Sequence, residues 1–319
     1  MRIKWQVPLY TAAYPLEQLS LSFLWCSCIF NVFNATMNNI VTSEGAAKTT
    51  MCALLRRRKF EDAKFLGKYW LVIFDATGLF HFQERHCPHC LKKIINKGTK
   101  EEKAVYYHHV LETKLVLGDG FVVSMGTEFI ENEDENVSKN DCETKAFKRL
   151  SKKLKKEYPR LPVCVLADSL YASEPVFRRC LKDNKWHILM RYKKGSIPSI
   201  AEEYRAIADA GDSEGLDRQI ARKYPRKGKV KEKHHMEWIP EIDYRGYKLT
   251  LLALEEETEA ERTGEKERKT FQWLTDLVVT GKNAGEFAGV GWQRWQILYE
   301  LWFYANFSGQ KPHTYCIAA

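Results

Sequence analysis

Two apolar runs, each followed by an aspartate, dominate the hydrophobic pattern of the chain. The first covers residues 69–74 and ends before Asp75, and the second covers residues 162–167 and ends before Asp168. Neither run alternates between apolar and polar positions, which predicts strands buried on both faces. Each strand then brings a carboxylate to its end, and a pair of such carboxylates suits a divalent cation. The alternative for each aspartate alone is a turn or cap residue, with residues 75–78 forming a turn.

The pattern around these runs predicts further strands and helices in a regular order. A hairpin turn at residues 118–120 joins two of the strands. Asn140 or Asp141 is expected to cap the first helix, which presents an apolar stripe beginning at Phe147. The order is strand, strand, strand, helix, strand, helix, strand, which indicates an α/β fold with a mixed sheet flanked by helices. The expected strands are 106–117, 121–131 and 185–192, and the expected helices are 141–158 and 173–182.

The remaining chain is divided into regions by the same criteria. A helix over residues 50–66 is expected to stop at Gly67. After residue 193 we expect a helix at 200–210 and two strands at 247–254 and 270–280, which together make a mostly β insertion before a last helix near Glu286. The predicted regions are 1–66, 67–192, 193–283 and 284–319.

The charge of the chain indicates what kind of partner it binds. The chain of 319 residues has 50 Lys and Arg against 41 Asp and Glu, a net charge of +9, which favours an anionic partner such as nucleic acid. Seven of the twelve residues from 222 to 233 are basic, and Pro225 and Gly228 indicate a loop. We expect this loop to contact phosphates, with a solubilising charged loop as the alternative. The predicted DNA-binding residues here are Arg222, Lys223, Arg226, Lys227, Lys229 and Lys231.

The nine cysteines show no disulfide framework, which is typical of a reduced, intracellular chain. Cys87 and Cys90 have the CxxC spacing of a zinc ligand pair, with His86 just before the pair and His89 within it. No second CxxC or HxxxH follows at a finger-like distance, so we predict a reduced loop here rather than zinc. The longest apolar run, residues 19–33, is shorter than the roughly 20 residues of a membrane span and predicts a buried element.

Several separated segments resemble the DDE transposases of bacterial insertion sequences, in the branch with a ribonuclease H-like core and a β-rich insertion. The resemblance extends over residues 50–297 and is carried by GKYWLVIFDATGLFHF, by residues 106–133, by residues 139–174, and by the short segments FQWLTDL and RWQI. It implies that the first and fourth strands of the core lie side by side, with Asp75 and Asp168 as neighbouring catalytic acids. It also implies two Mg²⁺ ions, which activate the attacking oxygen and stabilise the leaving oxygen of a phosphodiester.

The third acid is where the chain departs from this family. The family signature is Tyr, two residues, Arg, three residues, Glu, six residues, Lys. Arg294 fits the Arg, and we include it among the DNA-binding residues, but the Glu position is Leu298 and the Lys position is Ala305. Glu300 is the nearest acid and is assigned as the third catalytic candidate, although two residues rotate a helix by about 200° and turn it away. The similarity stops after Ile297, and we take a frameshift or truncation of the gene as a hypothesis.

The resemblance therefore implies Mg²⁺-dependent DNA cleavage and strand transfer, impaired in this chain. Two alternatives stay open: an inactive remnant that still binds DNA, and a ribonuclease H-like nuclease unrelated to transposition. The family usually acts as a dimer on the paired inverted-repeat ends of its element, without a membrane partner. The expected location is the bacterial cytoplasm, in association with the nucleoid.

Overall fold

The computed structural model describes residues 43–293, except 59, 84–85, 119–120, 135–136, 138, 194, 212, 225–227 and 261–265. It divides the chain into two units, residues 1–56 and 57–319. In the first unit, α2 (Ser43–Arg56) starts and ends earlier than the expected helix over 50–66. Gly67 does not end that helix but lies in a later turn with φ +64°, next to Leu66, which is also left-handed. The expected stop at Gly67 is therefore wrong.

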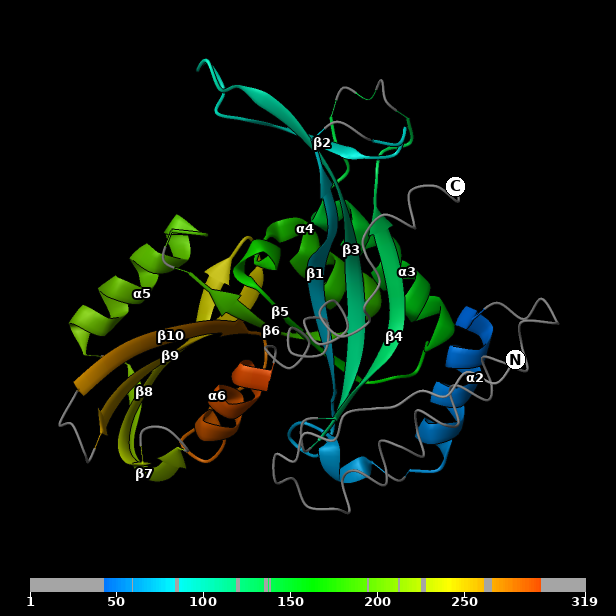
Figure 1. Ribbon diagram of the computed structural model, residues 1–319. Helices are drawn as coiled ribbons and strands as arrows, with labels where there is room; N and C mark the ends of the chain where they lie inside the picture. The colour runs from blue at the N-terminus through cyan, green and yellow to red at the C-terminus, as the bar shows by residue number, and fades with distance from the viewer. Residues whose placement is uncertain are drawn as a thin grey trace. The chain divides into compact units, whose positions relative to one another are not determined.

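The second unit is a mixed α/β structure built on one large sheet (Figure 1). Its described strands follow the order β2-β3-β1-β5-β6-β10-β9-β8-β7, and β4 also pairs with β3, on the edge that faces away from β1. β1 is antiparallel to β3 and parallel to β5, and β5 is parallel to β6. The first strands are β1 (Trp70–Phe82), β2 (Leu91–Ile95), β3 (Lys103–Gly118), β4 (Phe121–Ile130), β5 (Val163–Ala167) and β6 (His187–Tyr192).

The two apolar runs form the central pair of strands, as the pattern predicts. All five residues of β5 are buried, and so are Trp70 to Phe74 of β1. Strand side chains alternate between the two faces, so such runs need cover on both faces. On one face, Phe74 contacts Phe147 of α3 (Glu143–Glu157), with ring centroids 4.7 Å apart. On the other face, Ile73 belongs to a core cluster with Phe287 of α6 (Ala284–Gln293).

The helices differ from the predicted ones mainly at their ends. Cys142, not Asn140 or Asp141, occupies the N-cap of α3, and its side chain makes no cap hydrogen bond. Asp141 instead pairs with Arg149, and the Asn140 amide donates to the Lys92 carbonyl, so both expected caps have other partners. The remaining helical segments are η1 (Glu61–Ala63), η2 (Ser169–Tyr171), α4 (Glu174–Phe177), the π-helical η3 (Arg178–Asn184) and α5 (Pro198–Ala210).

The insertion continues the same sheet. β10 pairs antiparallel with β6, and β9, β8 and β7 follow it in antiparallel order. Its strands are β7 (Glu214–Tyr224), β8 (Gly228–Tyr244), β9 (Tyr247–Ala260) and β10 (Lys266–Thr275). The expected loop over residues 222–233 is wrong, because most of this stretch belongs to the paired strands β7 and β8.

A β-bulge in β8 and a glycine in α6 allow the insertion and α6 to fit the sheet. A β-bulge between Ile239 and Ile242 accommodates Pro240, which lacks the N–H that a regular ladder needs. Gly291 of α6 lies so near Trp273 that an added Cβ would come within 2.3 Å of the indole nitrogen. Any larger residue at position 291 would push α6 off β10.

Part of the sheet extends as an arm. We define the arm as residues 78–108, comprising the outer half of β1, the strand β2 and the first half of β3 (Figure 1). Among the described strands β2 pairs with β3 alone, and Lys92, Lys93 and Ile94 on it are exposed. The sequence analysis missed β2, because a five-residue strand with two lysines gives no clear alternation.

Candidate functional site

Asp75 and Asp168 follow the last paired residues of the two central strands. The parallel register of β1 and β5 ends at Phe74 opposite Ala167, so the two aspartates occupy adjacent positions at the same end of the pair. The expectation that they are neighbours is confirmed by this register. Both residues are partly buried.

The turn predicted as the alternative for residues 75–78 is not formed. β1 continues to Phe82, and Asp75 pairs with Glu112 of β3 on its other side. Phe74 points toward α3, so alternation directs Asp75 to the opposite face, the one on which α6 packs. Glu112 is the cross-strand partner of Asp75 and lies on the same face. The ammonium group of the buried Lys114 is 4.0 Å from the Glu112 carboxylate.

Asp168 caps the start of η2, which is the role that the sequence analysis gave as the alternative to metal binding. Its Oδ1 accepts a hydrogen bond of 2.6 Å from the Ser169 N–H at the start of η2. This bond holds the carboxylate in a fixed orientation at the end of β5. A cap role and a ligand role are compatible, because a carboxylate has two oxygens and about four acceptor sites.

Glu143, at the start of α3, is a third acid that lies close to Asp168, and the sequence analysis did not identify it. Tyr171 donates a hydrogen bond of 3.1 Å to the Glu143 carboxylate. Burial raises the pKa of Glu143, the negative charge of Asp168 raises it further, and the Tyr171 bond opposes both. Burial also raises the pKa of Tyr171, and the charges of Glu143, Asp75 and Asp168 add to this effect. We call Asp75, Asp168 and Glu143 the carboxylate cluster.

A signal for Glu143 was present in the sequence. The buried stripe of α3 contains Phe147, Leu150 and Leu154, and one helical turn before Phe147 on the same face is Glu143. Continuing the stripe toward the N-terminus reaches an acid in the first turn. The hydrogen bond from Tyr171 of η2 to Glu143 shows that this turn lies beside the segment that Asp168 caps.

The other predicted site residues fall into two groups. Arg294, Leu298 and Glu300 lie outside the described residues, as do Arg226 and Lys227. The β7–β8 register places Lys223 opposite Lys229 and Ala221 opposite Lys231, next to the step formed by Arg222 and Val230. The predicted basic stretch is therefore the end of a β-hairpin.

Two other groups of side chains among the described residues have the composition of metal ligands. Cys87, Cys90 and His108 place their sulfur and nitrogen atoms within 4.8 Å of one another, and we call them the Cys–His cluster. Glu232, His234 and Glu256 do the same in the insertion, where all three are buried. There His234 Nε2 lies 3.4 Å from each carboxylate, so the imidazole stands between the two acids across β8 and β9.

Comparison with known proteins does not assign this chain. No family model matches it, and no curated protein sequence matches it. Among the described residues, no helix is both long and apolar enough to cross a membrane.

Proposed function

We propose that this chain is a DNA transposase with a ribonuclease H-like core, and that Asp75 and Asp168 hold the divalent metal of its phosphoryl-transfer site. The observation that carries the proposal is the β1–β5 register, which sets the two aspartates side by side at the end of the central strands. The strand order β4-β3-β1-β5-β6, with three antiparallel strands followed by two parallel ones, supports the ribonuclease H-like assignment.

The chemistry of the cluster fits Mg²⁺. Carboxylates packed close together repel one another, and a hard divalent cation with oxygen ligands relieves this repulsion. Burial is the main cause of the raised pKa of Glu143, and repulsion by the Asp168 carboxylate adds to it. When bound, Mg²⁺ supplies Lewis-acid stabilisation of the attacking and leaving oxygens of the phosphodiester.

The chain itself contributes position and charge. Asp75 and Asp168 would hold the ion, and the Ser169 N–H fixes the second of these carboxylates. Glu143 is the third acid that we assign to the site among the described residues. Tyr171 orients Glu143 through its hydroxyl group, and Lys114 brings a positive charge to the face of Asp75. The basic hairpin ends of β7 and β8 would contact the DNA backbone, which carries no sequence information.

A cleavage assay tests the proposal. Purified protein is incubated with Mg²⁺ and labelled duplexes that carry either the ends of the element encoding the chain or a scrambled sequence. We expect cleavage and joining at the element ends by the wild type and not by Asp75→Asn. Asp209→Asn is the matched control, because Asp209 is an exposed aspartate of α5 and should leave the rate unchanged.

Each other outcome has a definite meaning. Equal rates for the wild type and Asp75→Asn would show that the cluster does no chemistry and would overturn the proposal. Equal cleavage of both duplexes would favour a nuclease without end specificity. Binding to the element ends without cleavage would favour the inactive remnant, and this binding should weaken steeply with salt if phosphate contacts dominate.

A further inference from the structure

The Cys–His cluster lies at the base of the arm. Cys87 and Cys90 precede β2, and His108 comes from β3 at the point where the arm joins the rest of the sheet. The three residues are separated by 18 and 21 positions in the chain, counted from His108 to each cysteine. The sequence analysis found the CxxC pair but not its partner, because only the pairing of β2 with β3 brings His108 next to it.

The distances within the cluster match one coordination shell. The two sulfur atoms are 3.5 Å apart, and His108 Nε2 lies 3.2 Å from the Cys87 sulfur and 3.1 Å from the Cys90 sulfur. Zinc bonds of about 2.3 Å to sulfur and 2.0–2.1 Å to nitrogen, arranged as a tetrahedron, would separate sulfur from sulfur by about 3.8 Å and sulfur from nitrogen by about 3.6 Å. Shifts of a few tenths of an ångström are enough to reach those values.

The surroundings favour a metal over an exposed reactive thiol. Cys90 is only 5% exposed, and Cys87 is partly buried. The Cys87 N–H donates to the Cys90 sulfur over 3.3 Å, a bond that stabilises negative charge on that sulfur. Two soft sulfur ligands with one imidazole are suited to Zn²⁺ and unsuited to Mg²⁺ or Ca²⁺.

We propose that Cys87, Cys90 and His108 bind one Zn²⁺ ion, which fastens the arm to the sheet. Zinc takes four ligands, so one position remains for water or a further donor of the chain. β3 is the one described neighbour of β2, and a strand with a single paired edge gains little stability from its own contacts. A metal bound by residues before β2 and within β3 supplies the connection that packing does not.

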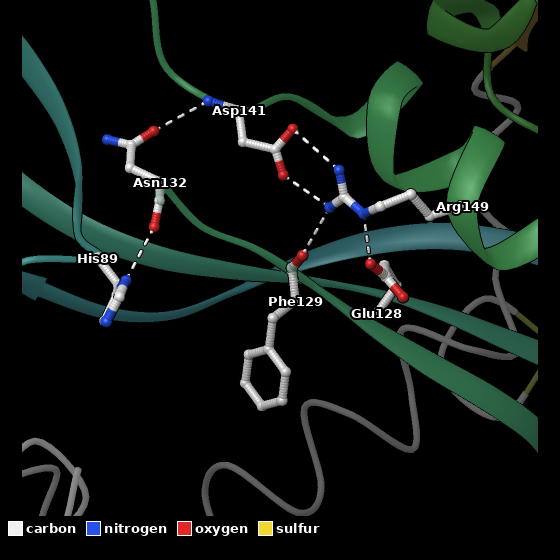
Figure 2. A network of polar contacts seen from close by, with 6 residues as sticks. All are labelled: His89, Glu128, Phe129, Asn132, Asp141 and Arg149. Carbon is white, nitrogen blue, oxygen red and sulfur yellow. Dashed lines mark hydrogen bonds and ion pairs between the residues drawn. The ribbon is translucent and has the colours of Figure 1, made fainter. Parts of the chain in front are cut away.

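Hydrogen bonds also connect the Cys–His cluster to the start of α3. The Asn132 side chain donates to the Cys90 carbonyl over 2.9 Å and accepts from the Asp141 N–H over 3.0 Å. Asp141 in turn pairs with Arg149 of α3, and His89 in the CxxC loop contacts the Asn132 carbonyl, as Figure 2 shows. Zinc at the arm would therefore also steady the helix end that carries Glu143.

Metal analysis of the purified full-length chain tests the proposal. We expect about one zinc per chain by elemental analysis, falling below about 0.2 in Cys87→Ser, Cys90→Ser and His108→Ala. Cys142→Ser is the matched control, because Cys142 is an exposed cysteine outside the cluster and should keep the full zinc content.

A second measurement on the wild type avoids variants that fail to fold. Replacement of the zinc by Co²⁺ should give the visible absorption of tetrahedral cobalt with thiolate ligands. Zinc removal by a chelator should expose two additional thiols to a thiol reagent. A zinc-free protein in which the two cysteines react at the same rate with and without added Zn²⁺ would overturn the proposal. So would a Cys87–Cys90 disulfide in protein prepared without oxidant.

Discussion

The carboxylate cluster and the Cys–His cluster are built in opposite ways. The carboxylate cluster sits at the end of two fully buried parallel strands, and its aspartates are held by the central ladder of the sheet. The Cys–His cluster sits at the base of an arm whose outermost strand, β2, pairs with one strand in the described part of the chain. In the first, packing positions the ligands, and a metal would serve chemistry. In the second, the ligands are brought together across a weak junction, and a metal would serve structure.

This comparison predicts that the two clusters respond differently to the loss of one ligand. Asp168→Asn should lower Mg²⁺-dependent cleavage by about 1,000-fold, because it removes several kcal/mol of metal-mediated stabilisation of the transition state. The midpoint of urea unfolding should change little. Cys90→Ser should lower zinc content and the stability of the arm, with a smaller loss of cleavage. Equal losses of cleavage in the two variants would remove the distinction between a chemical and a structural site.

The packing beneath the carboxylate cluster should give the next largest effect. Phe147 contacts Phe74, the neighbour of Asp75, and also contacts Tyr171, the partner of Glu143. Phe147→Ala should lower the free energy of unfolding by about 3–5 kcal/mol, since it empties a fully buried aromatic site. Phe129→Ala is the control, because Phe129 is 53% exposed and should stay within about 0.5 kcal/mol of the wild type. Urea denaturation measures both, and a similar cost for the two would show that α3 does not support the site.

The two aspartates of the carboxylate cluster were more predictable than His108 of the Cys–His cluster for a physical reason. Two uninterrupted apolar runs indicate central strands, and an aspartate after each run marks their ends without knowledge of any other residue. His108 gives no such signal. It belongs to a strand of mixed composition next to His109, and only its pairing across β2 and β3 distinguishes it.

The same reason explains what was missed in the insertion. β7 contains Asp217, Arg218 and Gln219 in sequence, so it shows no apolar alternation, and its strand structure comes from pairing with β8. Pro240 argues against a strand, yet β8 accommodates it in a bulge. Local pattern identifies elements that bury their own side chains, and it fails for elements that depend on a neighbour.

Asn132 connects the Cys–His cluster with the start of α3, the helix that carries Glu143. Its side chain is buried and connects the Cys90 carbonyl with the Asp141 N–H before α3. Asn132→Ala should lower the free energy of unfolding by about 1–3 kcal/mol, because it leaves buried polar groups without partners. It should also weaken zinc affinity by about 10- to 100-fold, the usual effect of losing an outer contact of a metal site.

A conservative variant separates the two connections of Asn132. Asn132→Asp keeps an acceptor for the Asp141 N–H and loses the donor to the Cys90 carbonyl. We expect it to lower zinc affinity while the unfolding of α3, followed by hydrogen exchange, stays near that of the wild type. Loss of protection in α3 with normal zinc affinity would show that the two clusters are not connected through this residue.

The smallest expected effect is a pH dependence specific to the carboxylate cluster. Burial and the charge of Asp168 raise the pKa of Glu143 in the folded protein above its ordinary value of 4.5, although the Tyr171 bond opposes them. A carboxyl group with a raised folded pKa contributes stability that is full below its unfolded pKa and is lost as the pH rises through its folded pKa. The metal-free wild type should therefore lose stability relative to Glu143→Gln as the pH rises above about 4.5.

The effect of Mg²⁺ on the stability of the wild type and Glu143→Gln tests this prediction further. Once ionised, Glu143 faces the negative charge of Asp168, and a bound cation would turn this repulsion into attraction. Added Mg²⁺ should thus stabilise the wild type more than Glu143→Gln and reverse their order in thermal unfolding. It should leave the Cys–His cluster unchanged, because hard cations bind sulfur poorly. If Mg²⁺ raises the melting temperatures of both proteins equally, Glu143 takes no part in the metal site, and the ligands must come from the two aspartates without it.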